Sequence, residues 1–254
     1  MVKNHRIAII GIFKSIDGEA FHAGQPTVFV RTMFCNLRCL YPCDTPECWT
    51  EDIFYKVYKN EPERHIEWLT AQDIFQRVED LEKNFDYKSI CLTGGEPLLE
   101  DNKDFMLNEL IPLFIDHDYA VNIETNGSID YRPYKEKFGD PIILDPYGNR
   151  KGVTIIADYK LPCSGETSHM LSSNLALYSP YDIIKCVISD SEEDWKAFED
   201  LCKSGTKAKF YLSPCFGKVT MSRIPEFVYS HPQYHITAQI QEHKYFWSPQ
   251  TKDV

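Results

Sequence analysis

Stretches with strand-like and helix-like patterns alternate along most of this chain. The strand-like stretches are rich in β-branched and aromatic residues and lie at 27–32, 88–97, 119–127, 152–160, 181–189, 208–214 and 234–241. Between them, 70–84 and 105–117 carry apolar residues at helical spacing, the second interrupted by Pro112. Repeated strand–helix–strand units predict an α/β fold with a mainly parallel sheet and right-handed crossovers.

Two helix starts carry residues that are typical of N-caps. Thr70 directly precedes the apolar pattern of 70–84 and is expected to cap that helix. Ser189 and Glu192 form a capping-box pattern, which predicts that a later helix begins at Ser189.

Polar residues and glycines gather where several of the expected strands end. They lie at 94–96, 124–127, 158–160 and 213–214. Ligands of open parallel sheets bind at the carboxyl ends of the strands. The pattern therefore predicts one site fed by several strands.

The length and charge of the chain limit its organisation and its partners. Its 254 residues suit a single domain over 1–254, in which the turn-rich stretch 44–68 is interpreted as an insertion or lid. The formal net charge of −11 argues against a nucleic-acid or membrane partner, because both normally need a basic face. No early segment resembles a signal peptide, so we expect the protein to lie in the cytoplasm.

Four of the nine cysteines, Cys35, Cys39, Cys43 and Cys48, fall within 34–49. In a reducing compartment disulfides are improbable, so the residues are interpreted as metal or cluster ligands or as redox groups. All four together would suit a structural zinc site. Three thiolates in one loop suit an iron–sulfur cluster, and three ligands leave one iron of a four-iron cluster open to a small molecule.

The stretch "LTGGEPLL", at 92–99, ends one of the expected strands with two glycines. Glycine allows a backbone to approach a ligand closely, although such a turn alone is common. Together with the cysteine loop it is typical of the radical S-adenosylmethionine (SAM) enzymes, which the sequence resembles.

Within that superfamily the chain is most similar to the 7-carboxy-7-deazaguanine synthase (QueE) family. The stretches that carry the resemblance are "SIDGEA" at 15–20, "FVR" at 29–31, "FCNLRC" at 34–39, "CDT" at 43–45, "ETNGS" at 124–128, "DYKLPCSG" at 158–165 and "QIQEHKYFW" at 239–247. The second gap between cysteines is one residue longer than usual, and Asp17 and Ala20 replace a glutamine and a glycine of the family pattern. Cys43 and Cys48 both remain candidates for the third ligand, with the following Asp-Thr favouring Cys43.

The resemblance implies a partial radical-SAM β/α barrel and a set of cofactors. These are a [4Fe–4S] cluster, S-adenosylmethionine and Mg²⁺. It also implies a lyase reaction, the ring contraction of 6-carboxy-5,6,7,8-tetrahydropterin to 7-carboxy-7-deazaguanine with loss of ammonia, in queuosine or deazapurine biosynthesis. Whether the product serves tRNA or DNA modification is left open.

The same resemblance assigns roles to particular residues. The cluster ligands would be Cys35, Cys39 and Cys43, with Thr45 on magnesium. Substrate-binding residues would be Ile16, Asp17, Gly18, Glu19, Arg31, Thr93, Gln241 and His243. Cofactor-binding residues would be Gly95, Glu96, Glu124, Asn126, Asp158 and Lys160. Purely structural alternatives are a surface role for Arg31, a turn cap for Thr45 and a packed side chain for His243.

The resemblance also implies an electron donor and an assembly, and two alternative functions are left open. A flavodoxin is the expected electron donor, and a homodimer is the expected assembly. An activating enzyme of a glycyl-radical protein shares the cysteine loop and the Gly-Gly-Glu strand end. A non-catalytic zinc module, using Cys35, Cys39, Cys43 and Cys48, is the alternative from a different class.

Overall fold

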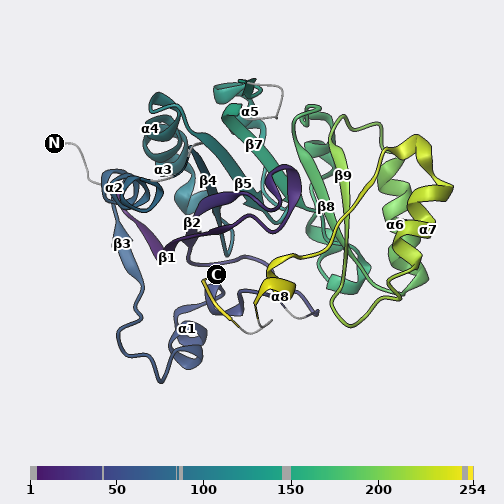
Figure 1. Ribbon diagram of the computed structural model, residues 1–254, viewed down its shortest axis with the longest axis horizontal. Helices are drawn as coiled ribbons and strands as arrows, with labels where there is room; N and C mark the ends of the chain where they lie inside the picture. Colours follow the sequence, from purple (N-terminus) through teal and green to yellow (C-terminus); the bar gives the residue numbers. More distant parts are fainter. Residues whose placement is uncertain are drawn as a thin grey trace.

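A mixed sheet forms the centre of the computed structural model, which describes residues 5–41, 43–83, 85, 88–144, 150–247 and 251–253 (Figure 1). Its strands are β1 (Ile7–Ile16), β2 (Pro26–Thr32), β3 (Glu67–Leu69), β4 (Ser89–Gly94), β5 (Ala120–Thr125), β6 (Ile142–Ile143), β7 (Arg150–Asp158), β8 (Ile183–Ile188), β9 (Lys209–Pro214) and β10 (Thr237–Ala238). They lie in the order β10-β9-β8-β7-β5-β4-β2-β1-β3, with β6 paired to β7. From β2 to β10 along this path every pairing is parallel, whereas β1 is antiparallel to β2 and β3. The predicted α/β class is confirmed.

The helices connect the strands and cover the sheet. They are α1 (Glu51–Val57), α2 (Ala71–Glu82), α3 (Glu100–Phe105), α4 (Ile111–Asp116), α5 (Arg132–Phe138), α6 (Glu192–Cys202), α7 (Arg223–Ser230) and α8 (His243–Phe246). Figure 1 shows α2, α3 and α4 beside one end of the sheet and α6 and α7 beside the other. Helices α1 and α8 lie apart from them, near the last described residues.

The capping residues were predicted correctly in one case and wrongly in the other. Thr70 caps α2 in a reciprocal capping box, accepting the backbone N–H of Asp73 and donating its own to that carboxylate. The cap of α6 is Ser191, which accepts the backbone N–H of Glu193, so the prediction of Ser189 was wrong. Ser189 directly follows β8, and its hydroxyl instead donates to buried Asp194 at 2.6 Å.

Two other elements differ in form from their sequence patterns. The helical stretch continues past residue 105, but Met106–Leu110 adopts π-helical geometry before α4, with Pro112 in the first turn of α4. A local change of helix geometry is how a chain commonly accommodates the N–H that proline lacks. The strand expected over 234–241 is only the two-residue β10, which pairs with β9 at the edge of the sheet.

Two apolar clusters matter for the position of the site. The main core packs the sheet against the helices, and its largest fully buried side chains include Tyr119, Phe114 and Phe198. A smaller cluster joins Ala8, Ile10, Met33, Cys48, Phe54 and Tyr58. It ties the stretch 44–68 to β1, and β3 at the far end of that stretch pairs with β1 as well. The sheet thus supports this stretch from two sides.

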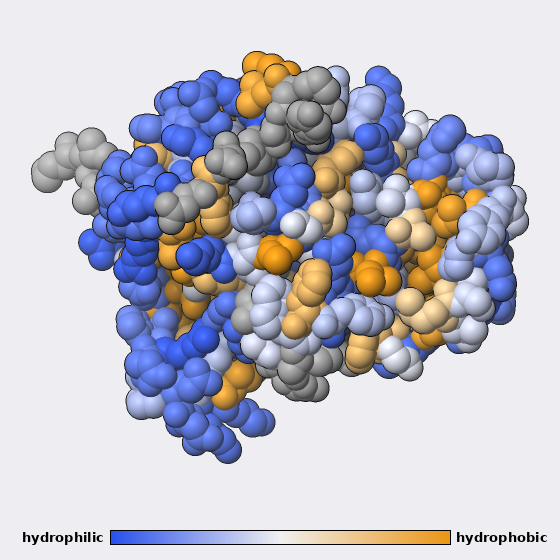
Figure 2. Space-filling model, in the orientation of Figure 1, coloured by the Kyte–Doolittle hydropathy of each residue, from blue (hydrophilic) through white to orange (hydrophobic). Residues whose placement is uncertain are grey.

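The surface carries no extended apolar band on the face shown in Figure 2. Hydrophobic side chains appear there as separate patches, over the middle of the molecule and beside α6 and α7, within a largely hydrophilic surface. Within the described ranges, the chain forms no helix with the length and hydropathy of a membrane span.

Candidate active site

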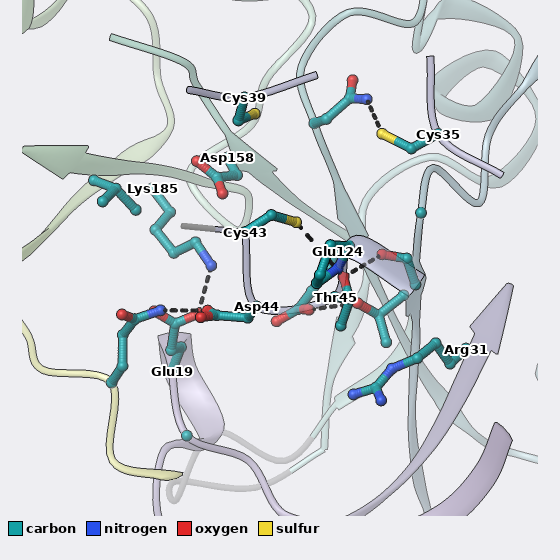
Figure 3. Close-up of a pocket in the computed structure, with 18 of the residues that line it drawn as sticks. Glu19, Arg31, Cys35, Cys39, Cys43, Asp44, Thr45, Glu124, Asp158 and Lys185 are labelled. Atoms are coloured by element: carbon teal, nitrogen blue, oxygen red, sulfur yellow. Dashed lines mark hydrogen bonds and ion pairs between the residues drawn. The ribbon is translucent and has the colours of Figure 1, made fainter. Parts of the chain in front are cut away.

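A cavity of about 580 Å³ opens where the parallel strands end. Thr93 and Gly94 end β4, Thr125 ends β5 and Asp158 ends β7, and all four line it. Figure 3 shows the thiols of Cys35, Cys39 and Cys43 toward one end of this space and Arg31 and Glu19 toward the other. A cavity therefore lies at the carboxyl ends of these strands, where the sequence pattern predicts the site.

The cysteine loop after β2 contributes three thiols to the cavity and keeps the fourth away. Cys35, Cys39 and Cys43 line the cavity. Cys48 is completely buried in the small apolar cluster beside Phe54 and Tyr58. The structure therefore separates Cys48 from the other three thiols, which does not suit a four-cysteine zinc site. Among the described residues, no three His, Cys, Asp or Glu side chains are grouped so that they would hold a single metal ion.

The glycine pair after β4 lets the cysteine loop lie directly on the strand end. A Cβ on Gly95 would stand 1.9 Å from the carbonyl oxygen of Phe34, and one on Gly94 would stand 2.2 Å from that of Thr32. Gly94 also has a φ of +120°, which other residues rarely adopt. The backbone N–H of Gly95 donates to Thr32 at 3.1 Å. The close approach explains why no side chain is tolerated here.

Glu96 lies outside the residues that line the cavity, which differs from its expected role beside the cofactor. Its buried carboxylate accepts hydrogen bonds from the backbone of Leu98, the hydroxyl of Thr125 and the backbone of Asn126, at 2.9, 2.8 and 2.7 Å. Burial raises its pKa to about 7. The carboxylate therefore fixes the end of β5, which carries Asn126 into the cavity, and that residue in turn lies 3.7 Å from the sulfur of Cys35.

A second group of polar residues follows β7. The Nζ atom of Lys160 lies 2.7 Å from Asp158 and donates to the hydroxyl of Tyr41 at 3.1 Å. Burial lowers the pKa of Lys160, but the nearby Asp158 and Tyr41 raise it well above its usual value. The other oxygen of Asp158 is buried without a hydrogen-bond partner among the described residues, so it can accept a donor from a bound molecule.

Carboxylates are concentrated toward the end of β1. Glu19 forms a buried ion pair with Lys185 of β8, while Asp17 accepts the backbone N–H of Glu19 at 3.1 Å. Thr93 donates its hydroxyl to Glu124 at 2.8 Å. Burial, and next the nearby charge of Glu124, raise the pKa of Asp17 to about 8. We therefore expect Asp17 to hold its proton at neutral pH.

Arg31 and Thr45 both face the cavity. A guanidinium nitrogen of Arg31 lies 2.6 Å from the carboxylate of Asp253, and its carbon lies 4.8 Å from the centre of the Phe13 ring. Thr45 donates to the carbonyl of Gly94 at 3.2 Å and makes no side-chain capping bond to the short 3-10 helix that follows it. Arg31 is therefore not a surface arginine, and the side chain of Thr45 does not cap the turn that follows it.

Of the remaining predicted residues, some line the cavity and one has a side chain outside the described residues. Ile16, Gly18 and Gln241 line the cavity, and Gln241 donates to Asp44 at 3.1 Å. The side chain of His243 lies outside the described residues.

Several lining residues were missed by the sequence analysis: Tyr41, Asp44, Lys185, Lys244, Lys252 and Asp253. A lysine inside the apolar stretch of β8 was a usable signal, because a buried charge needs a partner.

Comparisons with known proteins agree with this geometry. A model of the Radical SAM superfamily matches residues 29–139. The 7-carboxy-7-deazaguanine synthase of Clostridium acetobutylicum is 32% identical over 249 residues, covering 97% of this chain and 98% of that protein. The enzyme of the same name from Koribacter versatilis is 30% identical over 264 residues, covering 97% and 99%.

A solved structure shows the same fold. The crystal structure of QueE from Escherichia coli superposes with a TM-score of 0.63 at 19% identity, covering 93% of this chain and 94% of the other. The expected partial barrel, with its mainly parallel sheet, is confirmed by this likeness. With three thiols and a glycine-ended strand meeting in one cavity, and with relatives that match over nearly their full lengths, this chain belongs to the 7-carboxy-7-deazaguanine synthase family of radical SAM enzymes.

Proposed function

We propose that the cavity converts 6-carboxy-5,6,7,8-tetrahydropterin into 7-carboxy-7-deazaguanine with release of ammonia. The observation that carries this proposal is the meeting of three loop thiols, a glycine-ended strand and Arg31 in one cavity. A planar heterocycle with one carboxylate needs apolar walls, a few fixed polar groups and a cationic fork. The cavity offers each of these.

The thiol-lined end suits an iron–sulfur cluster. Cys35, Cys39 and Cys43 would be its ligands. Burial raises the pKa of Cys39 to about 11, so this site favours a neutral thiol until a metal cluster supplies positive charge. When bound there, the cluster and S-adenosylmethionine would supply one-electron radical chemistry for hydrogen abstraction.

Residues at the ends of β4, β5 and β7 would hold S-adenosylmethionine. Gly95, Glu124 and Asn126 line the cavity at these strand ends. Asp158 offers a carboxylate oxygen that has no hydrogen-bond partner among the described residues. Lys160 orients that carboxylate from the other side. Glu96 would act by fixing Asn126 rather than by touching the cofactor.

The opposite end would hold the pterin. Arg31 would bind its carboxylate, Glu19 would accept from ring N–H groups, and the backbone of 16–18 would lie along its edge. Thr93 and Gln241 would complete the wall, with His243 as a further candidate. Thr45 would ligate a magnesium ion beside the substrate carboxylate, since Mg²⁺ prefers oxygen ligands and tolerates few from the protein.

The proposal extends to the organisation of the enzyme. The chain would be one catalytic domain over 1–254, with 44–68 as an insertion that covers the substrate end. A flavodoxin would donate the electron, and the enzyme would act as a homodimer. These features rest on the family resemblance.

Turnover after anaerobic iron–sulfur reconstitution tests the proposed reaction. The reconstituted protein should be brown and should convert the tetrahydropterin acid to the deazaguanine acid, followed by mass spectrometry and by ammonia release. A protein that cleaves S-adenosylmethionine but leaves the pterin unchanged would disprove the proposed substrate. A colourless protein that retains zinc would disprove the radical mechanism.

A further inference from the structure

The carboxylate of Asp253 lies between two guanidinium groups. One of its oxygens accepts from Arg31 at 2.6 Å, and the other accepts from Arg64. The three side chains are largely withdrawn from solvent, with exposed fractions of 15% for Asp253, 14% for Arg31 and 27% for Arg64. Two arginines that converge on one carboxylate form a site for that chemical group.

Both guanidinium groups are held in place independently of Asp253. The carbon of the Arg31 guanidinium lies 4.8 Å from the centre of the Phe13 ring, and that ring stacks on Phe29 at 5.4 Å. Arg64 lies over Tyr58, with 4.7 Å between its guanidinium carbon and the ring centre. Stacking on an aromatic ring is a common way of fixing a guanidinium fork before its ligand arrives.

The two arginines come from different parts of the chain. Arg31 is on β2, whereas Arg64 lies in the stretch 44–68, near its pairing with β1 through β3. Arg64 also contacts Glu61, with 3.1 Å between Nε and the carboxylate. The stretch 44–68 thereby brings a second cation to Asp253, which lines the cavity, while Arg64 itself lies behind that carboxylate and does not line it.

The residue next to Asp253 holds it in place, but Asp253 does not accept from every N–H group of Arg31. The neighbouring Lys252 pairs with buried Glu47 at 3.0 Å and donates to the carbonyl of Asp44 at 2.6 Å. Asp253 itself has a φ of +57°, a conformation that costs free energy for a residue other than glycine. The Nε atom of Arg31 is buried without a hydrogen-bond partner among the described residues. A carboxylate that engages the whole fork would therefore compete well with Asp253.

We propose that Arg64 is a second carboxylate-binding residue of the active site, and that Asp253 occupies this subsite until the carboxylate of the substrate replaces it. The inference rests on the proposed function, which gives the substrate its carboxylate. The subsite would therefore select ligands that carry an anionic group, because such a group is needed to displace Asp253 from two guanidinium groups. Because the substrate binds only when Asp253 leaves, its apparent affinity is lowered by the fraction of time for which Asp253 occupies the site.

Binding of two fluorescent ligands tests this exchange. 6-Carboxypterin and pterin differ only in the carboxylate, and each is titrated into reconstituted protein with S-adenosylmethionine present. Arg64→Gln should weaken binding of 6-carboxypterin about tenfold and that of pterin less than twofold, with Arg64→Lys between. Asp253→Asn should tighten binding of 6-carboxypterin about threefold or more and leave pterin unchanged. Arg77→Gln is the matched control, because Arg77 pairs with Glu67 at 2.7 Å and Glu67, unlike Asp253, does not line the cavity.

Each other outcome has one meaning. If Arg64→Gln behaves like Arg77→Gln, or if the wild type does not distinguish the two ligands, Arg64 is not a carboxylate ligand and the inference fails. If Asp253→Asn weakens binding of 6-carboxypterin, Asp253 assists the ligand and no exchange takes place. A wild type that prefers 6-carboxypterin but does not turn over the tetrahydropterin acid would disprove the proposed reaction and leave this inference standing.

Discussion

The end of the cavity that holds the three thiols and the end that holds Arg31 draw on different parts of the chain. The thiol end is built from one loop and from the ends of adjacent parallel strands, β4, β5 and β7. The end that holds Arg31, which is the proposed substrate end, joins β1 and β2 to the stretch 44–68 and to residues beyond 240.

The two ends also differ in the contacts that hold them. Backbone contact without side chains shapes the thiol end, where Gly94 and Gly95 lie against the loop. Ion pairs shape the substrate end, among them Glu19 with Lys185 and Asp253 with two arginines. A site of backbone contacts tolerates almost no added volume, whereas a site of ion pairs responds to charge and pH. Substitutions at the two ends should therefore fail in different ways.

The largest effect is expected at the thiol end, for Gly95→Ala. The added Cβ would stand 1.9 Å from the carbonyl oxygen of Phe34, so the cysteine loop must move away from β4. We expect loss of cluster iron and a decrease in the free energy of unfolding on the order of 3 kcal/mol. Iron content and thermal unfolding would check this. Gly11→Ala, whose Cβ would meet only ordinary contacts from 3.5 Å, should keep its iron.

A second pair of substitutions distinguishes a cysteine that binds the cluster from one that packs in the core. Cys43→Ala should lose the cluster and all activity, because its thiol lines the cavity. Cys48→Ala should keep the cluster and lose about 1–2 kcal/mol of stability, because it empties space in the buried cluster around Phe54. Iron analysis and the electron paramagnetic resonance signal of the reduced cluster would decide. Retention of iron in Cys43→Ala with its loss in Cys48→Ala would reverse the assignment.

At the substrate end, Arg31→Lys should leave the cluster intact and weaken substrate binding. A point charge replaces a planar fork, which costs about 1–3 kcal/mol, or roughly a five- to hundredfold rise in KM. Steady-state kinetics with the tetrahydropterin acid would measure it. The same KM in the variant and the wild type would remove Arg31 from the carboxylate subsite.

Thr45→Ala should keep the cluster but lose most of the stimulation by magnesium, since the proposed ligand hydroxyl is gone. We expect turnover to fall about tenfold through poorer positioning of the substrate. Thr45→Ser restores the hydroxyl and should recover much of the rate. Equal stimulation of Thr45→Ala and the wild type by magnesium would contradict the assignment.

The smallest effect concerns pH and Asp17. Burial, with the charge of Glu124, raises its pKa from 3.8 to about 8, so the folded protein holds a proton that the unfolded chain has released. Stability from this group is therefore greatest at low pH and falls as pH rises from 3.8 toward about 8. Asp17→Asn should remove this slope and make the protein more stable than the wild type at the alkaline end.

Urea unfolding at several pH values would measure this difference. Asp118→Asn is a control at an exposed carboxylate, and it should keep the slope of the wild type. A wild-type slope retained by Asp17→Asn would show that another group, such as Glu96, is responsible.

Features that depend on neighbouring residues were predicted well from the sequence. The strands and helices follow from local periodicity, and the cap at Thr70 from residues within one turn. The loop thiols and the glycine pair are recognisable because each must satisfy a constraint within a few residues: ligand spacing in one case, the absence of a side chain in the other.

Features that depend on contacts between residues far apart in the sequence could be read only from the tertiary structure. Cys48 and Cys43 were both candidates for the third ligand, but Cys48 packs into the apolar cluster on β1 and Cys43 lines the cavity. Glu96 faces Thr125 and Asn126 because β5 lies beside β4. Ser189 donates its hydroxyl to Asp194, and Ser191 caps α6 in its place. The pairing of Arg31 and Arg64 with Asp253 joins residues 189 and more positions apart, which no local pattern encodes. Local chemistry thus determines which groups can bind metal or cofactor, whereas burial and long-range charge decide which of them face the cavity.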